Sequence, residues 1–406
     1  MMTSTLLASP HEFEAAPAPA RALFRLLTRM QLGRLSVTLP GGASLDFGAA
    51  PEAQPRAAIR LHRWHACAAV LKSGDIGFAE SFIAGDWSTP DLPALLRLLI
   101  ANRNAFEAVF YGSWWGSLLH RARHLVNRNS RRGSKKNIHA HYDLGNEFYR
   151  LWLDPTMNYS SAWFEGGRGG DLVTAQHAKV RRALAECGTR PGDRVLEIGC
   201  GWGALAEAAA RDFGATVTGV TLSREQLAWG QRRLADAGLP GELRYQDYRD
   251  IDDGPFDAIV SIEMFEAVGR EYWPQFFATL NAQLKPGGKA CVQSITIRDD
   301  LFERYVRSTD FIQQYIFPGG LLPSPRAFRA AAAAAGLRIV GELDFGLDYA
   351  ETLRRWRTGF LGAEGRVRRL GFDARFMRIW EFDLGYCEAA FDTGNTSVMQ
   401  FTLERL

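Results

Sequence analysis

The glycine-rich stretch VLEIGCGWG at 195–203 constrains the fold more than any other part of the sequence. An apolar run that contains Glu197 is followed by Gly199, Gly201 and Gly203 at every second position. Glycine has no Cβ, so the backbone can turn sharply there and a ligand can lie against it. The stretch predicts a strand, a tight turn and a helix, with a cofactor at the carboxyl end of the strand. A turn without a ligand is the alternative.

Hydrophobic runs alternate with amphipathic stretches through the second half of the chain. The runs predict strands near 193–198, 215–220, 241–246, 256–262 and 287–295, and the stretches between them, such as 223–238 and 271–284, predict helices. Regular alternation of this kind is typical of a parallel sheet with helices on both faces. The expected fold class is therefore α/β.

The length of 406 residues predicts more than one domain. Residues 21–30 predict a helix, 33–48 a hairpin and 90–110 one longer helix, so we expect a small amino-terminal α/β domain at 1–120. A basic linker is expected at 121–137, and a larger domain at 138–406.

The linker carries most of the charge asymmetry of the chain. Residues 121–136 contain seven Lys or Arg and no acid, whereas the net charge of the whole chain is only +3. Such a run is either a solvated linker or a contact for an anionic lipid or nucleic-acid surface, and charge alone does not separate these readings.

The absence of a signal peptide pattern, of a long apolar stretch and of paired cysteines predicts the compartment and the metal content of the protein. The start MMTSTLLASPHEFE has no basic region before an apolar one, and no long uninterrupted apolar stretch occurs, so we expect a cytoplasmic protein that does not span a membrane. The five cysteines are scattered, which predicts neither disulfides nor a metal site.

The glycine spacing separates two classes of nucleotide-binding turn. Dinucleotide-binding turns have GxGxxG, whereas this chain has ExGxGxG, which resembles the first motif of S-adenosylmethionine-dependent methyltransferases. At the end of the second strand Thr221 stands where many such folds have an acid for the ribose hydroxyls. We expect Thr221 and Gln226 to supply polar contacts instead.

Several further stretches resemble one family, the cyclopropane-fatty-acyl-phospholipid synthases and related lipid methyltransferases, which include the mycolic acid cyclopropane synthases. They lie in family order at 141–164, 195–203, 219–226, 246–250, 261–269, 315–324 and 349–356, and 73–92 resembles that family's smaller domain. The resemblance implies a Rossmann-like class I methyltransferase fold with a seven-stranded, mostly parallel sheet. It also implies a set of cofactor-binding residues: Tyr159, Ser160, Glu197, Gly199, Cys200, Gly201, Gly203, Thr221, Leu222, Gln226, Asp247 and Tyr248.

The reaction implied by the resemblance transfers the methyl carbon of S-adenosylmethionine to a cis double bond of an unsaturated phospholipid acyl chain, which gives a cyclopropane ring. The enzyme would then lie peripherally on the inner face of the membrane, against anionic lipid head groups, and a homodimer stays open. Insertions at 299–324 and 349–391 would form the acyl-chain pocket. Aromatic residues before the first strand would either be core or roof the site: Tyr142, Phe148, Tyr149, Trp152, Tyr159, Trp163 and Phe164.

The family closes the ring with a bound bicarbonate, which takes a proton from the added methyl carbon. The matching positions here are Glu266, Tyr349 and Ile295, and Cys387 matches another active-site position. Glu266 could also be an acid in the first turn of a helix.

Two positions depart from the synthase pattern: Ser161 replaces a cysteine, and Gln293 replaces a histidine that can take a proton. The bicarbonate site is therefore retained, weakened or used differently. A methylene- or methyl-branched product, which shares the methyl transfer with ring formation, is the alternative to the ring. More remote alternatives are a nucleic-acid methyltransferase and a lipid-binding protein without activity.

Overall fold

The computed structural model describes residues 10–48, 50, 52–110 and 144–406, which divide into two compact units. The basic linker expected at 121–137 and the aromatic residue Tyr142 lie outside the described residues. The first unit consists of the described part of Met1–Arg123 with Ser308–Tyr315 and Arg368–Thr393, and the rest forms the second unit.

The first unit contains a four-stranded sheet with the strand order β2-β1-β3-β4. β1 and β2 form the antiparallel hairpin that the sequence predicts, with Thr38 opposite Ser44. The predicted helix at 21–30 is confirmed as α2. The elements are α1 (Pro10–Ala15), α2 (Ala18–Leu27), β1 (Arg34–Thr38), β2 (Ser44–Gly48), β3 (Arg56–Leu61), α3 (His65–Ile83), β4 (Trp87–Ser88), α4 (Leu92–Ala101), α5 (Arg103–Phe110), α14 (Phe311–Tyr315) and α18 (Ala374–Asp392).

The single helix predicted at 90–110 is wrong, because the chain breaks into α4 and α5 at Asn102. The side-chain amide of Asn102 accepts hydrogen bonds from the backbone N–H groups of Gln31 and Leu32 at 2.9 and 3.0 Å and donates one to the Leu32 carbonyl at 2.9 Å. These bonds join segments 70 residues apart. A local hydrophobic pattern carries no sign of them.

The second unit is built on a seven-stranded sheet with the order β10-β11-β9-β8-β5-β6-β7. Strands β5 to β9 run parallel, and β11 is antiparallel to both β9 and β10. The strands are β5 (Arg194–Ile198), β6 (Thr216–Thr221), β7 (Gly241–Tyr245), β8 (Phe256–Ile262), β9 (Leu284–Ile297), β10 (Leu337–Asp344) and β11 (Thr396–Arg405). The five predicted strands and the α/β class are confirmed.

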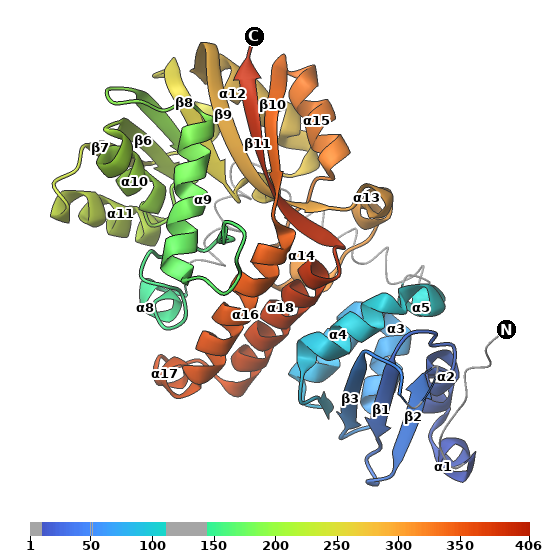
Figure 1. Ribbon diagram of the computed structural model, residues 1–406. Coiled ribbons are helices and arrows are strands. Elements are labelled where there is room, and N and C mark those ends of the chain that lie inside the picture. Colours follow the sequence, from blue (N-terminus) through green and yellow to red (C-terminus); the bar gives the residue numbers. More distant parts are fainter. Residues whose placement is uncertain (1–9, 49, 51, 111–143) are drawn as a thin grey trace. The chain divides into compact units, whose positions relative to one another are not determined.

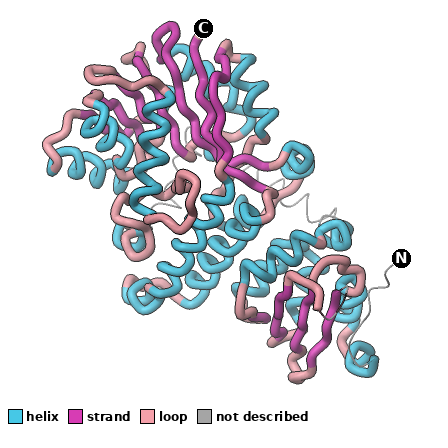
Figure 2. Tube along the Cα trace, in the orientation of Figure 1, coloured by secondary structure: helices cyan, strands magenta, loops and turns pink. Residues whose placement is uncertain are grey.

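Helices cover both faces of this sheet (Figures 1 and 2). α9 (Leu172–Glu186), α10 (Ala204–Phe213) and α11 (Arg224–Asp236) bury apolar side chains against one face, and α12 (Trp273–Gln283) and α15 (Pro325–Ala334) against the other. The remaining helices are α8 (Asn146–Tyr149), α13 (Asp299–Arg307), α16 (Gly346–Gly362) and α17 (Glu364–Arg369), with short 3-10 turns at Tyr248–Asp250, Phe265–Ala267 and Arg270–Tyr272.

Caps explain where two of the helices that flank the site begin. Asp171 accepts the Thr174 N–H at 2.8 Å before α9, and Ser223 accepts the Gln226 N–H at 3.3 Å before α11. Such side chains satisfy N–H groups that have no partner within the helix.

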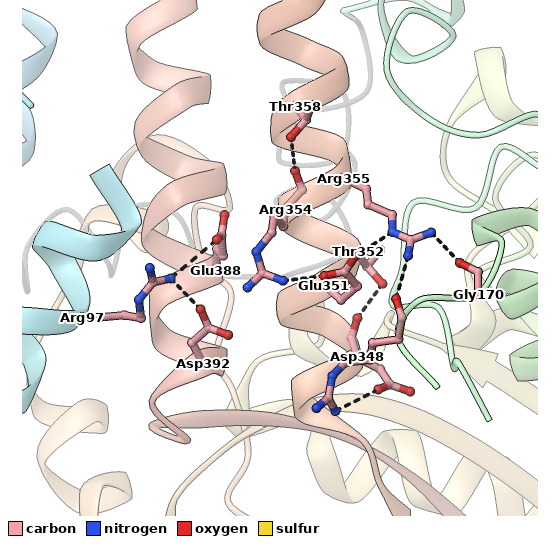
Figure 3. Close-up of polar contacts among 11 residues, drawn as sticks. Arg97, Gly170, Asp348, Glu351, Thr352, Arg354, Arg355, Thr358, Glu388 and Asp392 are labelled. Atoms are coloured by element: carbon pink, nitrogen blue, oxygen red, sulfur yellow. Dashed lines mark hydrogen bonds and ion pairs between the residues drawn. The ribbon is translucent and has the colours of Figure 1, made fainter. Parts of the chain in front are cut away.

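The expected domain at 138–406 differs from the structure in two places. α14 and α18 pack with the first unit, where the guanidinium of Arg97 on α4 lies 3.6 Å from the Glu388 carboxylate and 2.6 Å from that of Asp392 on α18 (Figure 3).

Within the described ranges, no helix is both long enough and apolar enough to cross a bilayer.

Candidate active site

The glycine turn between β5 and α10 has positive φ angles at all three glycines: 88° at Gly199, 47° at Gly201 and 81° at Gly203. A Cβ at Gly203 would lie 3.1 Å from the Cα of Gly230 in α11, and a Cβ at Gly199 would lie 3.0 Å from the Met264 Cβ. A Cβ at Gly201 would meet no described atom within 4 Å. Gly203 therefore permits close helix packing, whereas Gly201 leaves open space beside the turn.

Glu197 lies on β5 just before the turn and is only 4% exposed. The Oε2 atom of its carboxylate has no hydrogen-bond partner in the described part of the chain. Burial raises the pKa of Glu197 well above its ordinary value. S-adenosylmethionine carries an ammonium group and hydroxyls that can donate hydrogen bonds. An unpartnered carboxyl oxygen and the open space at Gly201 therefore fit this cofactor.

The end of β6 lies directly beside the turn. The N–H groups of Gly199 and Cys200 both donate to the Val220 carbonyl at 3.0 Å. Thr221 and Gln226 are buried, and the Thr221 hydroxyl donates to the Gln226 side-chain oxygen at 3.3 Å. Thr221 stands where many related folds have an acid, and Leu222 directly follows it.

Asp247 and Tyr248 follow β7. The end of β7 lies beside the end of β6, because the Gln246 N–H donates to the Thr221 carbonyl at 3.2 Å. Arg249 donates to both oxygens of the Asp247 carboxylate, at 2.8 and 2.6 Å. The Tyr248 hydroxyl is buried with no hydrogen-bond partner among the described residues, and burial raises its pKa to about 12. The predicted residues that follow β5, β6 and β7 thus meet at one edge of the sheet.

An aromatic cluster connects this edge to α16. Tyr149 lies 5.2 Å from Trp202 of the glycine turn and 5.5 Å from Tyr159, measured between ring centroids. The Trp356 ring on α16 lies 5.4 Å from Tyr159 and 5.8 Å from Trp152. Tyr159 begins the loop at 159–170, which we call the roof segment. Of the aromatic residues expected before the first strand, Phe148, Tyr149, Trp152 and Tyr159 therefore lie in this cluster. Phe164 packs instead with Ala162 and Ala175, and Trp163 lies against the Arg182 guanidinium.

α9 holds the amino-terminal end of the roof segment. The Lys179 ammonium donates to the Ser160 hydroxyl at 2.6 Å, and the Gln176 side chain donates to the Ser160 carbonyl at 2.9 Å. Lys179 is 0% exposed, and its burial lowers its pKa to about 8, although the Glu263 carboxylate opposes that shift. Lys179 could not be predicted as a site residue, because no sequence pattern in α9 distinguishes it from a surface lysine.

α16 holds the rest of the roof segment through side chains on one face of the helix, and Figure 3 shows the contact of Arg355 with Gly170 among them. Asp348 accepts the Phe164 N–H at 2.8 Å, and the Thr352 hydroxyl accepts the Ala162 N–H at 3.2 Å. Arg355 donates to the Arg168 and Gly170 carbonyls at 2.7 and 2.8 Å and pairs with Glu351. Positions 348, 352 and 355 follow the helical period, so they face the same way.

A half-buried carboxylate, Glu263, lies at the centre of the polar residues of the site. The Ser161 backbone N–H and the Gln293 side chain donate to its Oε1 at 2.8 and 2.7 Å, and the Tyr349 hydroxyl donates to its Oε2 at 2.7 Å. The Ser161 hydroxyl donates instead to the Ala162 carbonyl at 2.9 Å. Our sequence reasoning missed Glu263, although an acid placed directly after an apolar strand was the available signal.

Glu266 and Ile295 form a separate pair. The Ile295 N–H donates to Glu266 Oε1, and Glu266 Oε2 is buried with no hydrogen-bond partner among the described residues. Burial, reinforced by the neighbouring Glu263 carboxylate, raises the pKa of Glu266 to about 8. Of the five positions that the resemblance relates to the bicarbonate site, three therefore contact Glu263 and two contact each other.

Cys387 lies on α18 in the first unit, where its thiol contacts the Asp383 carboxylate at 3.8 Å. Burial raises the pKa of that thiol well above its ordinary value. A role for Cys387 in the active site stays a prediction.

Comparison with known proteins extends these observations. The family model described as mycolic acid cyclopropane synthetase matches residues 129–401. The chain is 38% identical to tuberculostearic acid methyltransferase UfaA1 of Mycobacterium tuberculosis, over 95% of this chain and 93% of that protein. It is 33% identical to the cyclopropane-fatty-acyl-phospholipid synthase of Escherichia coli, over 97% and 96% of the two chains.

Solved structures agree with the sequence matches. The crystal structure of mycolic acid cyclopropane synthase CmaA1 with SAH and CTAB superposes with a TM-score of 0.63 at 32% identity, over 67% of this chain and 98% of that chain. These matches confirm the resemblance and the Rossmann-like methyltransferase fold predicted from the motifs.

Proposed function

Because the chain belongs to the mycolic acid cyclopropane synthetase family, we propose that it converts the cis double bond of an unsaturated phospholipid acyl chain into a cyclopropane ring. It is an S-adenosylmethionine-dependent methyltransferase. Glu197, Gly201 and the ends of β6 and β7 would hold the cofactor, which supplies the methyl group when bound.

The observation that carries this proposal is the closeness of three features. The cofactor turn contacts the aromatic cluster through Trp202. It also lies against Met264, the residue next to Glu263. A donor site, apolar ring faces and an acid that can accept a proton thus adjoin one another. A reaction that adds a methyl cation to an alkene needs these three features together.

The aromatic cluster suits the positive charge that the alkene carries after attack. The alkene π electrons form the new bond to the methyl carbon and leave a cation on the neighbouring chain carbon. Ring faces attract such a cation by about 2 kcal/mol when water is excluded. Roof contacts with α9 and α16 keep water away from this charge.

Ring closure then requires loss of a proton from the added methyl carbon. Its C–H electron pair forms the third bond of the ring, and the proton passes to a base. A methylene branch is the second candidate product, favoured by Gln293 in place of a histidine. It needs a hydride shift from the methylated carbon to the cationic carbon before the methyl proton is lost. Subsequent reduction would give a methyl branch.

The test is transfer of labelled methyl groups from S-adenosylmethionine to vesicles of cis-monounsaturated phospholipid. We expect label in the lipid, with saturated phospholipid, RNA and DNA as controls that stay unlabelled. Proton NMR of the product separates upfield ring methylene protons from downfield vinylidene protons, which mass alone cannot do because the two products are isomers. Label in nucleic acid, or in no acceptor, would reject the proposal.

The basic residues at 121–136 extend the proposal to the membrane surface. Each Lys or Arg near an anionic leaflet contributes about 1 kcal/mol, so neutralising five of them should weaken binding to anionic vesicles by 10² or more. The variant replaces Arg128, Arg131, Arg132, Lys135 and Lys136 with glutamine. Cosedimentation should fall with salt for the wild type, and neutral phosphatidylcholine vesicles are the control. Equal, salt-independent binding by both proteins would make the stretch a linker only.

A further inference from the structure

The Glu263 carboxylate accepts hydrogen bonds from three parts of the fold. Ser161 belongs to the roof segment, Gln293 to β9 and Tyr349 to α16, with donor-to-acceptor distances of 2.7–2.8 Å. The Gln293 amide is itself oriented, because its oxygen accepts from the Gln400 side chain at 3.0 Å on β11. The three donors therefore point at a single position.

Those donors come from three of the positions that the family resemblance assigns to bicarbonate. A free bicarbonate would compete with Glu263 for the same hydrogen bonds and would place a second negative charge beside it. The residues present therefore do not fit a separate anion. We propose that the Glu263 carboxylate takes the place of bicarbonate and is itself the base that removes the proton from the methyl carbon.

The backbone at this position supports a role for the side chain. Glu263 has a φ of 49°, in the left-handed region that favours glycine. Its N–H donates to the Gln293 carbonyl at 2.8 Å, which fixes this conformation. Strained non-glycine residues persist mainly where a side chain is required for function. A glycine would adopt this φ at lower cost, which agrees with a role for the glutamate side chain.

The surrounding charges suit a base. Burial raises the pKa of Glu263, while the Lys179 ammonium and the hydrogen-bond donors oppose the shift. Glu266, with a pKa of about 8, is mostly neutral at pH 7 and adds little repulsion. A carboxylate that is ionised but has a raised pKa accepts a proton better than an exposed one.

The proposed step balances without another reactant, and it rests on the proposed function. The methyl C–H bond breaks, its electron pair closes the ring, and the proton joins a Glu263 oxygen. Release of the proton to water after product leaves restores the carboxylate.

The decisive variant is Glu263→Gly, which relieves the positive φ and frees the three donors for an external anion. Without bicarbonate its turnover should fall by about 10² or more, as should that of Glu263→Gln. Added bicarbonate should restore Glu263→Gly to within about tenfold of the wild type. It should not restore Glu263→Gln, which keeps the site filled. The wild type should not respond to removal of bicarbonate.

A binding measurement complements turnover. Line broadening of ¹³C-labelled bicarbonate should occur with Glu263→Gly and be absent with the wild type. Calorimetry with S-adenosylhomocysteine should show unchanged affinity for all variants. The matched control is Glu342→Gln, since the carboxylate of Glu342 on β10 pairs with Arg329, away from the site.

The outcomes separate this inference from the proposed function. A wild type that methylates lipid but loses activity without bicarbonate would overturn the role of Glu263, as would full activity of Glu263→Gln. A wild type that methylates no lipid under any condition would instead reject the proposed function.

Discussion

Replacing Gly201 with valine tests the cofactor turn more directly than any other change. A Cβ there meets no described atom within 4 Å, so the protein itself leaves room at this position. The φ of 47° is unfavourable for a β-branched residue and should cost about 1–3 kcal/mol of stability. That cost is a fraction of the 5–15 kcal/mol by which domains are typically stable. We therefore expect Gly201→Val to fold.

The cofactor should not tolerate the change, because the valine methyl groups occupy the space beside the turn. We expect its Kd to rise at least about 100-fold, which corresponds to about 2.7 kcal/mol. Calorimetry with S-adenosylhomocysteine measures the affinity, and urea unfolding without ligand measures the stability.

A matched control comes from Gly287, which has a φ of 72° and whose added Cβ would also meet nothing within 4 Å. Gly287→Val at the start of β9 introduces the same kind of strain away from the cofactor turn, so it should lose stability and keep its affinity. If Gly201→Val binds within threefold of the wild type, or if Gly287→Val loses affinity equally, the placement of the cofactor is wrong.

Three further changes test individual contacts. The pKa of Glu266 is raised to about 8, so a second carboxylate ionises beside the base as pH rises through 8; Glu266→Gln should remove that step from the pH profile of kcat/KM and leave the step of Lys179, whose pKa is lowered to about 8. Burial raises the pKa of Asp383 to about 7, so between pH 4 and 7 this carboxyl binds a proton in the folded chain but not in the unfolded chain. The free energy of unfolding should therefore fall as pH rises through this range, by at most about 4 kcal/mol from this group. Urea unfolding of Asp383→Asn should lack this fall. Thr352→Val leaves the Ala162 N–H without its acceptor and should cost about 1–3 kcal/mol, whereas Thr358→Val on the exposed side of the same helix should cost less than about 0.5 kcal/mol.

Each of these expectations has a result that contradicts it. Parallel pH profiles for the wild type and the Glu266 variant would mean that this carboxyl does not ionise beside the base. An unchanged pH slope in Asp383→Asn would assign the slope to other groups. Equal losses of stability in the two threonine variants would mean that the Thr352–Ala162 hydrogen bond does not contribute measurably to stability.

The framework of the second unit could be predicted because its signals are local. Apolar runs mark β5 to β9, because each buried strand needs apolar side chains. The glycine spacing marks the turn, because the backbone there adopts positive φ angles. The break at Asn102 could not be predicted, because it depends on hydrogen bonds to Gln31 and Leu32, far away in sequence. Resemblance pointed to the donors around Glu263 but not to their partner, because the family pattern supplies an external anion there.

The roof segment is hydrogen-bonded both to α16 and to the Glu263 carboxylate, which affects when the proton acceptor is complete. The roof bonds to Asp348, Thr352 and Arg355 lie on the helix that carries Tyr349, and Ser161 of the roof itself donates to the Glu263 carboxylate. Lifting the roof would therefore withdraw one donor and loosen the helix that supplies another. The proton acceptor is therefore completely assembled only while the roof segment is in place, so proton removal is coupled to the closed arrangement of this segment.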